Sequence, residues 1–237
     1  MSNRTNEYGQ PIGPSITDWK PPSSPARVGI EGRHCALEPL DPSRHTADLL
    51  DAHKAAPDSR AWTYLFAGPF QNDSDFHAYV KQSASSSDPM HFAVVDSATR
   101  RALGTMSLMR MDLVNGVIEV GHIAFSPSLQ QTIASTEAQY LLMRHVFEEL
   151  GYRRYEWKCD HLNDLSRRAA LRLGFRFEGI FRQAVIYKQR SRDTAWYSVI
   201  DSEWPLLRDA FERWLSPGNF DGGKQKASLA EFRENGA

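Results

Sequence analysis

Residues 117–150 read VIEVGHIAFSPSLQQTIASTEAQYLLMRHVFEEL. The first nine residues, 117–125, are rich in β-branched side chains and predict a strand. Ser126-Pro127 ends this strand, and the apolar residues between 132 and 150 predict a long helix closed by Gly151. The N-terminus of a helix exposes unpaired N–H groups and a partial positive charge, which favour a phosphate group. This strand–loop–helix unit is therefore the first candidate for a binding site.

The chain before this unit predicts three strands and two helices. Asn115-Gly116 predicts a hairpin turn, because both residues favour positive φ. The turn joins the strand predicted at 102–110 to the strand at 117–125. Together with a strand predicted at 91–96, these form an antiparallel meander. Further upstream we expect a strand at 33–40, a helix at 42–56 and a second helix that starts at Asp73, which can act as its N-cap.

The chain after the unit alternates strands with helices. A short strand is predicted at 155–159, and a helix at 165–173 is closed by Gly174. Strands at 179–187 and 194–200 follow, and a helix at 204–215 closes the domain; the turn between the two strands contains Lys188, Arg190 and Arg192. Antiparallel strands followed by strand–helix–strand units predict an α+β (mixed α/β) fold.

Composition divides the chain of 237 residues into three parts. Residues 1–26 are rich in Pro and Ser and read as an N-terminal arm, in which Tyr8, Ile12 and Trp19 can dock on the domain. Residues 27–216 form one domain. Residues 217–237 carry two consecutive glycines and several charges, and they predict a flexible C-terminal tail.

Charge and cysteine content exclude several classes of function. The formal net charge of -1 lacks the basic excess of a nucleic-acid-binding protein, so we expect no nucleic-acid partner. Cys35 and Cys159 are far apart and no Cys/His cluster accompanies them, so we expect no metal and a reducing, cytoplasmic setting. No apolar run approaches the roughly 18 residues that span a bilayer, so we expect no membrane partner.

Several short motifs, taken together, resemble a known family. Asn163 and Ser166 stand at the start of the 165–173 helix, and Glu119 lies in the segment VIEVGHIAFSP. Thr136-Glu137-Ala138 opens the long helix, and LGFRFEGIFRQ spans residues 173–183. This combination resembles the GNAT superfamily of N-acetyltransferases, and within it the branch of the RimJ and RimL ribosomal-protein acetyltransferases, over residues 33–204.

The resemblance implies a GNAT-like fold with a mostly antiparallel central sheet that is splayed in the middle and flanked by helices. It also implies acetyl-CoA as co-substrate, between the 117–125 and 155–159 strands, with its pyrophosphate on backbone amides of the 131–136 turn. Asn163 would contact the pantetheine, and Arg167 or Arg168 would reach the 3′-phosphate, unless they form only a solvated helix face. The cofactor-binding candidates are Ala124, Phe125, Gln130, Gln131, Thr132, Ile133, Ala134, Ser135, Thr136, Asn163, Ser166, Arg167 and Arg168.

The phosphate loop departs from the family pattern Gln/Arg-x-x-Gly-x-Gly/Ala. Gln130 fits the first position, but Ile133 and Ser135 stand where the two glycines belong. Glycine lets a backbone approach a ligand closely. A side chain is compatible with the same backbone contacts if it points away from the ligand.

The expected reaction needs a base, because an amine attacks a thioester only when it is neutral and an alkyl ammonium has a pKa near 10.4. Glu119 is the first candidate, since a carboxylate at this strand position resembles the base of several relatives; the alternative is a structural residue paired with an arginine. His122 is the second candidate. In a regular strand it faces away from Glu119, and a bulge would change that.

The leaving thiolate and the oxyanion need their own donors. Many family members carry a tyrosine where this chain has Ala170, so Ser166 becomes the candidate acid, as in the RimL-like branch. The oxyanion donor is expected to be a backbone N–H near Ala124 or Phe125.

The acceptor pocket is expected between the first two helices and the late hairpin, with Trp62, Tyr64, Arg182 and Tyr187 as substrate-binding candidates. The predicted reaction is direct attack of a primary amine on acetyl-CoA in a ternary complex. The amine is either a protein N-terminal α-amino group or a small molecule. A non-catalytic acyl-CoA-binding domain is the alternative, which Ile133 and the missing tyrosine favour. The branch often forms dimers, so a homodimer is a further expectation.

Overall fold

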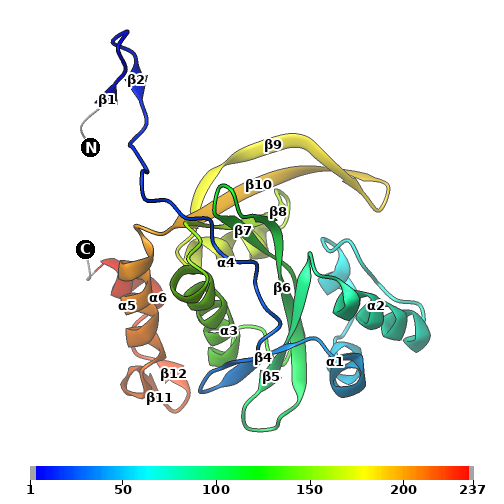
Figure 1. Cartoon of the computed structure of the whole chain (residues 1–237). Helices are drawn as coiled ribbons and strands as arrows, with labels where there is room; N and C mark the ends of the chain where they lie inside the picture. Colours follow the sequence, from blue (N-terminus) through cyan, green and yellow to red (C-terminus); the bar gives the residue numbers. More distant parts are fainter. Residues whose placement is uncertain (1–3, 235–237) are drawn as a thin grey trace.

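A central eight-stranded sheet organises the computed structural model, which describes residues 4–234 (Figure 1). Its strands lie in the order β3-β4-β5-β6-β7-β8-β10-β9. Only the β7–β8 pair is parallel among these neighbours. The predicted α+β class and mostly antiparallel sheet are confirmed. The bounds are β3 Ile30–Glu31, β4 Cys35–Pro39, β5 Met90–Asp96, β6 Ala102–Asp112, β7 Val117–Phe125, β8 Arg154–Asp160, β9 Arg176–Tyr187 and β10 Arg190–Ile200.

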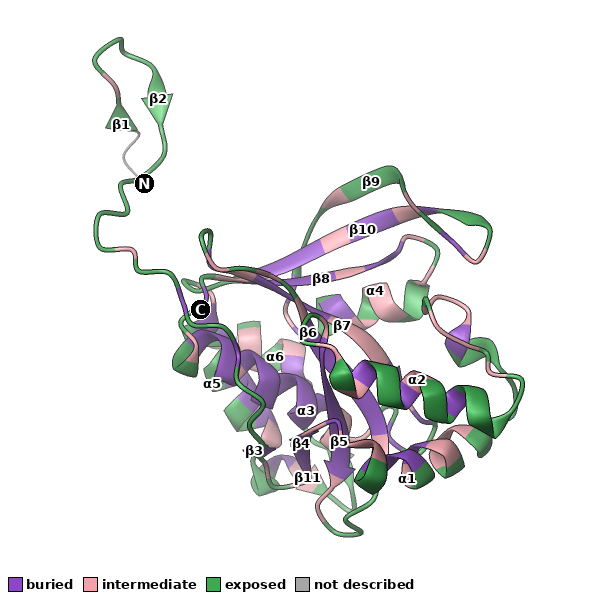
Figure 2. Ribbon diagram, turned by 45° about the vertical axis from the view of Figure 1, so that its right-hand side comes forward, coloured by how far each residue is buried: buried purple, intermediate pink, exposed green. Residues whose placement is uncertain are grey.

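Helices cover both faces of the sheet (Figures 1 and 2). On one side lie α1 Pro42–Lys54 and α2 Asp73–Ser85, and on the other lie α3 Ile133–Arg144 and α5 Trp204–Leu215; α4 Asp164–Arg172 follows β8. Alternation along β5 supplies both cores, because successive strand side chains point to opposite faces. Phe92 and Val94 join the cluster that contains α3 and α5, whereas Ala93 and Val95 join the cluster that contains α1 and α2.

The sheet splays open between β7 and β8, as the resemblance implies. The two strands pair only from Val117 with Arg154 to Val120 with Trp157. Beyond Val120, the edge of β7 that faces β8 has no strand partner among the described residues. A bulge follows at once, since Thr105 opposes Ala124 while Ser107 opposes Gly121, and His122 takes a left-handed φ of 48°.

The long helix predicted from 132 to 150 is present, and its last turns are wider than an α-helix. Thr132 caps α3, and its hydroxyl accepts the backbone N–H of Ser135 at 3.1 Å. The π-helix η2 His145–Glu149 continues α3. Glu137 on α3 is buried, and its carboxylate accepts the backbone N–H groups at the start of β4, including that of Cys35 at 2.9 Å. This residue of the family motif therefore joins α3 to the sheet.

The predicted hairpin between β6 and β7 is confirmed, but two local details were wrong. The β6–β7 connection is four residues long, 113–116, and Gly116 alone takes a positive φ, because the Asp112 carboxylate accepts the backbone N–H of Asn115 at 3.0 Å. The two-residue turn with both φ angles positive lies between β9 and β10, at Lys188 and Gln189. The N-cap of α2 is Asn72, one residue before Asp73.

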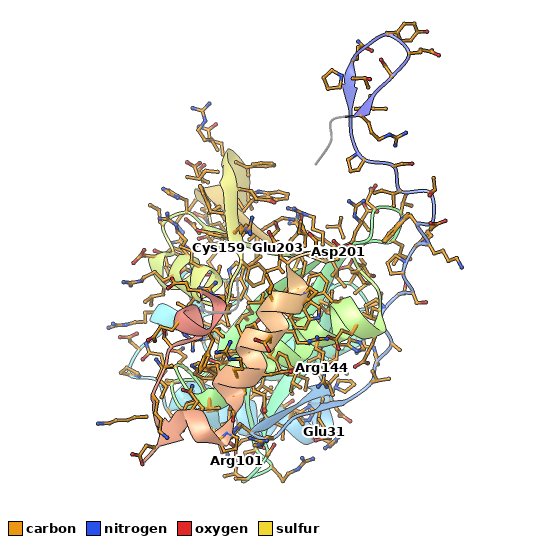
Figure 3. The ribbon with its side chains drawn as sticks, turned by 90° about the vertical axis from the view of Figure 1, so that its left-hand side faces the viewer. Glu31, Arg101, Arg144, Cys159, Asp201 and Glu203 are labelled. Atoms are coloured by element: carbon orange, nitrogen blue, oxygen red, sulfur yellow. The ribbon has the colours of Figure 1, made fainter. Side chains whose placement is uncertain are left out.

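The N-terminal arm leaves the domain beyond Trp19, and nearer the domain its Pro22 and Pro25 are buried. Its tip is a short hairpin of β1 Arg4–Thr5 and β2 Pro11–Ile12, whose side chains spread away from the domain (Figure 3). Tyr8 is 78% exposed. The Trp19 indole donates to the carbonyl of Val114 at 3.1 Å and lies against the Arg153 guanidinium. Of the three residues predicted to dock, only Trp19 makes such a contact.

The predicted flexible tail is folded in its described part, 217–234. After the 3-10 turn η3 Pro217–Asn219 it forms β11 Phe220–Asp221, β12 Lys224–Gln225 and α6 Leu229–Glu234. Leu229 is 1% exposed and belongs to the main core. Phe220 and Phe232 pack against the same core, and the buried Asn219 amide donates to the carbonyl of Trp214 at 3.0 Å, so several side chains hold the tail in place. No helix within residues 4–234 has the length and apolar character needed to cross a bilayer.

Candidate active site

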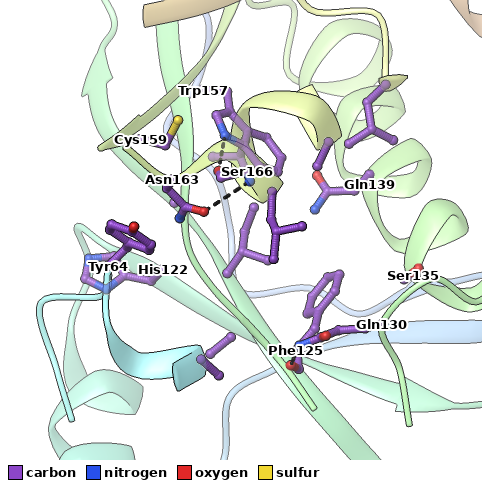
Figure 4. Close-up of a pocket in the computed structure, with 18 of the residues that line it drawn as sticks. Tyr64, His122, Phe125, Gln130, Ser135, Gln139, Trp157, Cys159, Asn163 and Ser166 are labelled. Carbon is purple, nitrogen blue, oxygen red and sulfur yellow. Dashed lines mark hydrogen bonds between the residues drawn. The ribbon is translucent and has the colours of Figure 1, made fainter. Parts of the chain in front are cut away.

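A cleft of about 1920 Å³ opens where β7 and β8 diverge (Figure 4). It is lined by β7 from Glu119 to Phe125, by the start of α3 and by the start of α4. A site for one drug-sized ligand usually measures roughly 300–1,000 Å³. The cleft therefore has room for two ligands side by side.

The loop before α3 presents backbone amides to this cleft without the glycines of the family pattern. Gln131 takes the left-handed conformation, with φ of 59°, whereas Ile133 is the first residue of α3 and has no positive φ. The N–H groups of Ile133 and Ala134 precede any intrahelical acceptor and remain available for an anion. Ile133 also packs against the main core. Neither Ile133 nor Ser135, which replace the two glycines, needs a positive φ in this loop.

Gln130 braces this loop against the end of β7. Its side-chain amide donates to the carbonyl of Phe125 at 2.8 Å. All residues from Gln130 to Thr136 line the cleft, as do Ala124 and Phe125. The open edge of β7 and the amides of α3 therefore form one continuous wall.

Asn163 and Ser166 face this wall from α4 (Figure 4). Asn163 is the N-cap, and its side-chain oxygen accepts the backbone N–H of Ser166 at 3.2 Å. Its amide nitrogen makes no hydrogen bond among the described residues. The Ser166 hydroxyl oxygen accepts the Trp157 indole N–H at 3.0 Å, so its own proton is free to be donated elsewhere.

The arginines near α4 differ in what they can reach. Arg167 donates to the hydroxyl of Tyr197 at 3.2 Å and does not line the cleft. Arg168 lies at the rim and pairs with Asp164 at 2.9 Å. Arg172 lines the cleft and donates to the Thr136 hydroxyl at 3.1 Å, next to the amides of α3. This residue was not among the sequence-based candidates.

Glu119 has features of both a base and a structural ion-pair residue. It lines the cleft and is 5% exposed, and it is also paired, with Lys158 Nζ at 2.8 Å and with Arg110 Nε at 3.4 Å. Lys158 contacts Glu156 as well, at 2.6 Å, and lies over the Trp196 ring. Burial raises the pKa of Glu119, and the charge of Lys158 opposes that rise.

The bulge in β7 brings His122 into the same cleft as Glu119. The His122 ring lies 5.1 Å from that of His91 and 6.4 Å from that of Phe66, between ring centroids. Burial lowers the pKa of His122, and burial together with the His122 charge lowers the pKa of His91 to about 4. Both imidazoles are therefore neutral near pH 7, and a neutral imidazole can accept a proton.

The acceptor candidates separate into two groups. Trp62 and Tyr64 line the cleft, and the Tyr64 hydroxyl donates to the carbonyl of Leu162 at 3.2 Å. Arg182 is exposed and does not line the cleft. Tyr187 is buried at the end of β9 and does not line the cleft; its hydroxyl donates to Asp160 at 2.8 Å. Further along the same hairpin, Arg192 lines the cleft and was not predicted.

Comparisons with known proteins agree with this geometry. The family model described as Acetyltransferase (GNAT) domain matches residues 36–176. A solved GCN5-related N-acetyltransferase from Brucella melitensis is 47% identical, with a TM-score of 0.90 over 92% of this chain and 100% of that one.

Two more distant relatives carry less weight. An acetyltransferase from Salmonella typhimurium, which modifies the N-terminal serine of ribosomal protein L7/L12, is 20% identical, with a TM-score of 0.61 over 73% of this chain and 99% of that one; this likeness shows the fold alone. The uncharacterised N-acetyltransferase YnaD of Bacillus subtilis is 27% identical over 86 residues, which are 36% of this chain and half the length of that relative.

Proposed function

The chain belongs to the GNAT family of acyl-CoA-dependent N-acetyltransferases, and on that premise we propose that it moves an acetyl group from acetyl-CoA to a primary amine by direct attack in a ternary complex. One observation carries the proposal. The divergence of β7 and β8 joins anion-binding amides, an open strand edge and two proton acceptors in one cleft with room for both substrates.

The residues of the cleft fit acetyl-CoA from one end to the other. The phosphates would lie on the amides of Gln131, Ile133 and Ala134, with Arg168 and Arg172 beside them. The pantetheine would run along the open edge of β7, opposite the Asn163 amide. Acetyl-CoA supplies the activated acyl group. The residues of this chain would orient it and transfer the protons of the reaction.

Proton transfer is assigned to three side chains. Glu119, whose carboxylate form the Lys158 charge favours, would take the proton of the attacking ammonium through a water, and neutral His122 is the second acceptor within the cleft. A backbone N–H near Ala124 or Phe125 would stabilise the negative charge that develops on the acyl oxygen. Ser166, whose oxygen is occupied by the Trp157 N–H, would donate its proton toward the leaving sulfur.

The test is release of free CoA thiol from acetyl-CoA in the presence of an amine library, for wild type, Glu119→Gln and His122→Asn. We expect amine-dependent release that falls about 10²–10⁴-fold when the true base is removed. Acetyl-CoA binding without release with any amine would favour the non-catalytic alternative. Peptides with free N-termini belong in the library beside small amines, because a distant relative modifies a protein N-terminus.

A further inference from the structure

Arg192 is a buried cation without a counter-ion in the cleft. It lies on β10 and is 7% exposed. Its Nε donates to the Thr194 hydroxyl at 3.1 Å, and no carboxylate oxygen lies within 4.0 Å of its guanidinium anywhere in residues 4–234. An unpaired buried charge is costly, so such groups normally have an anionic partner.

Two other cations close to the tip of the β9–β10 hairpin have structural partners. Lys188, at the tip, donates to the carbonyls of Trp62 and Ala67 at 2.6 Å and 3.0 Å. Arg190 donates to the carbonyl of Thr63 at 2.6 Å. These bonds fasten the hairpin over the 60–67 loop and account for both charges, whereas nothing comparable accounts for Arg192.

The carboxylates nearest to Arg192 along the chain and across the sheet are already occupied. Asp160 accepts the Tyr187 hydroxyl at 2.8 Å and the backbone N–H of Leu162 at 2.9 Å. Asp193 accepts the backbone N–H of Gln183 at 2.7 Å. In the cleft, Glu119 is paired with Lys158. None of these carboxylates lies within 4.0 Å of the Arg192 guanidinium, so a ligand in the cleft would supply its first close anionic contact.

The position of Arg192 points to the acceptor and away from the phosphates of acetyl-CoA. Its guanidinium lies 5.6 Å from the centre of the Phe66 ring, and that ring neighbours His122. Figure 4 shows His122 and Tyr64 on one side of the cleft and Gln130 and Ser135, at the phosphate loop, on the other. An anion at Arg192 and an amine near His122 would thus lie on either side of one aromatic ring.

We propose that Arg192 binds an oxyanion carried by the acceptor, so that the preferred substrate is an amine with a carboxylate or a phosphate several bonds away. This inference rests on the proposed function. The planar guanidinium matches both groups through paired N–H donors, and the aromatic ring beside it restricts its orientation. Polyamines, which carry only positive charge, are unfavourable acceptors for this site.

The test uses matched acceptors that differ only in charge. We would titrate the protein–CoA complex by calorimetry with ω-amino acids of increasing chain length, with their carboxamides, and with the corresponding amino-alkyl phosphates and amino alcohols. Each amine is then offered with acetyl-CoA to measure kcat/KM. The variants are Arg192→Met, which keeps an unbranched apolar stem without the charge, Arg192→Lys, which keeps the charge, and Lys81→Met, which removes an exposed cation on α2.

We expect wild type and Lys81→Met to bind the best anionic acceptor at least about tenfold more tightly than its neutral counterpart. Arg192→Met should abolish this preference while leaving the weak binding of neutral amines unchanged, and Arg192→Lys should retain part of it. The carboxylate and phosphate arms identify which oxyanion is preferred.

Equal affinity for anionic and neutral members in wild type, or a preference that survives in Arg192→Met, would overturn the inference. Failure of the proposed function looks different, because no amine would then be acetylated even where the anionic members bind. Acetylation of neutral amines alone would support the proposed function and overturn the role of Arg192.

Discussion

Replacement of Lys158 by Met should destabilise the protein in a pH-dependent way. Lys158 Nζ lies 2.8 Å from Glu119 and 2.6 Å from Glu156, and all three side chains are nearly inaccessible to solvent. Glu156 would keep Arg154 at 2.7 Å. Glu119 would keep only Arg110, at 3.4 Å and on a side chain more than half exposed. The substitution therefore leaves mainly one buried carboxylate without its close partner.

Removal of one partner from a buried ion pair costs about 3–5 kcal/mol. We expect the lower end of that range at pH 7, because Arg154 still satisfies Glu156 and Met fills the volume of the lysine stem. Burial already raises the pKa of Glu119 in the folded protein, and loss of the Lys158 charge raises it further. A carboxyl whose pKa is higher in the folded state loses stability as pH rises through the interval from its unfolded to its folded pKa. The penalty should therefore shrink at pH 5.

The assay is urea unfolding of wild type, Lys158→Met and the double variant Glu119→Gln/Lys158→Met at pH 7 and pH 5. The double variant should recover most of the loss, because no buried charge is then left unpaired. In the transfer assay, the acid limb of kcat/KM for Lys158→Met should move to higher pH, since Glu119 stays protonated longer. A single variant within about 0.5 kcal/mol of wild type at pH 7, or an equal loss at both pH values, would refute the reasoning.

Two further predictions concern the ends of the cleft and of the chain. Lys188→Met removes the ammonium that bonds both the Trp62 and Ala67 carbonyls and loosens the hairpin, so KM for the acceptor should rise while acetyl-CoA affinity measured by calorimetry stays unchanged. Equal losses for both substrates would contradict a role confined to the acceptor end. Leu229→Ala should lower the free energy of unfolding, measured in urea, by about 2–5 kcal/mol, since this side chain is 1% exposed. No change in that free energy would indicate a mobile tail.

The regular elements were predictable because their signals are local. Period-two and period-3.6 patterns located the meander and the helices from α1 to α5 to within a few residues. Competition between a side chain and the backbone for the same hydrogen bond was harder to predict. Asn115-Gly116 has the composition of a tight turn, but Asp112 captures the Asn115 N–H and lengthens the loop. Phe220, Leu229 and Phe232 are spread among glycines and charges without a helical or strand period, and only the finished core shows where they pack.

The parts of the site that belong to a family motif were predictable from the sequence. The parts that depend on which charged side chains pair with each other were not. Glu119, Asn163 and the loop before α3 line one cleft, as the resemblance implies. The roles of Lys158 and Arg192 were not predicted, because the sequence around a strand lysine or arginine does not reveal which residues its side chain contacts. One contacts two carboxylates and the other contacts none, and this difference arises from strand register and from bulges that the sequence pattern does not reveal.

Calorimetric titration with acetyl-CoA tests most directly whether the cleft between β7 and β8 is the donor site. Wild type should bind with a dissociation constant in the micromolar range, on the order of the KM values common for such substrates. Asn163→Ala should bind several-fold more weakly, and Lys81→Met should match wild type. Absence of binding at millimolar acetyl-CoA, or equal affinity in Asn163→Ala, would contradict the assignment of this cleft.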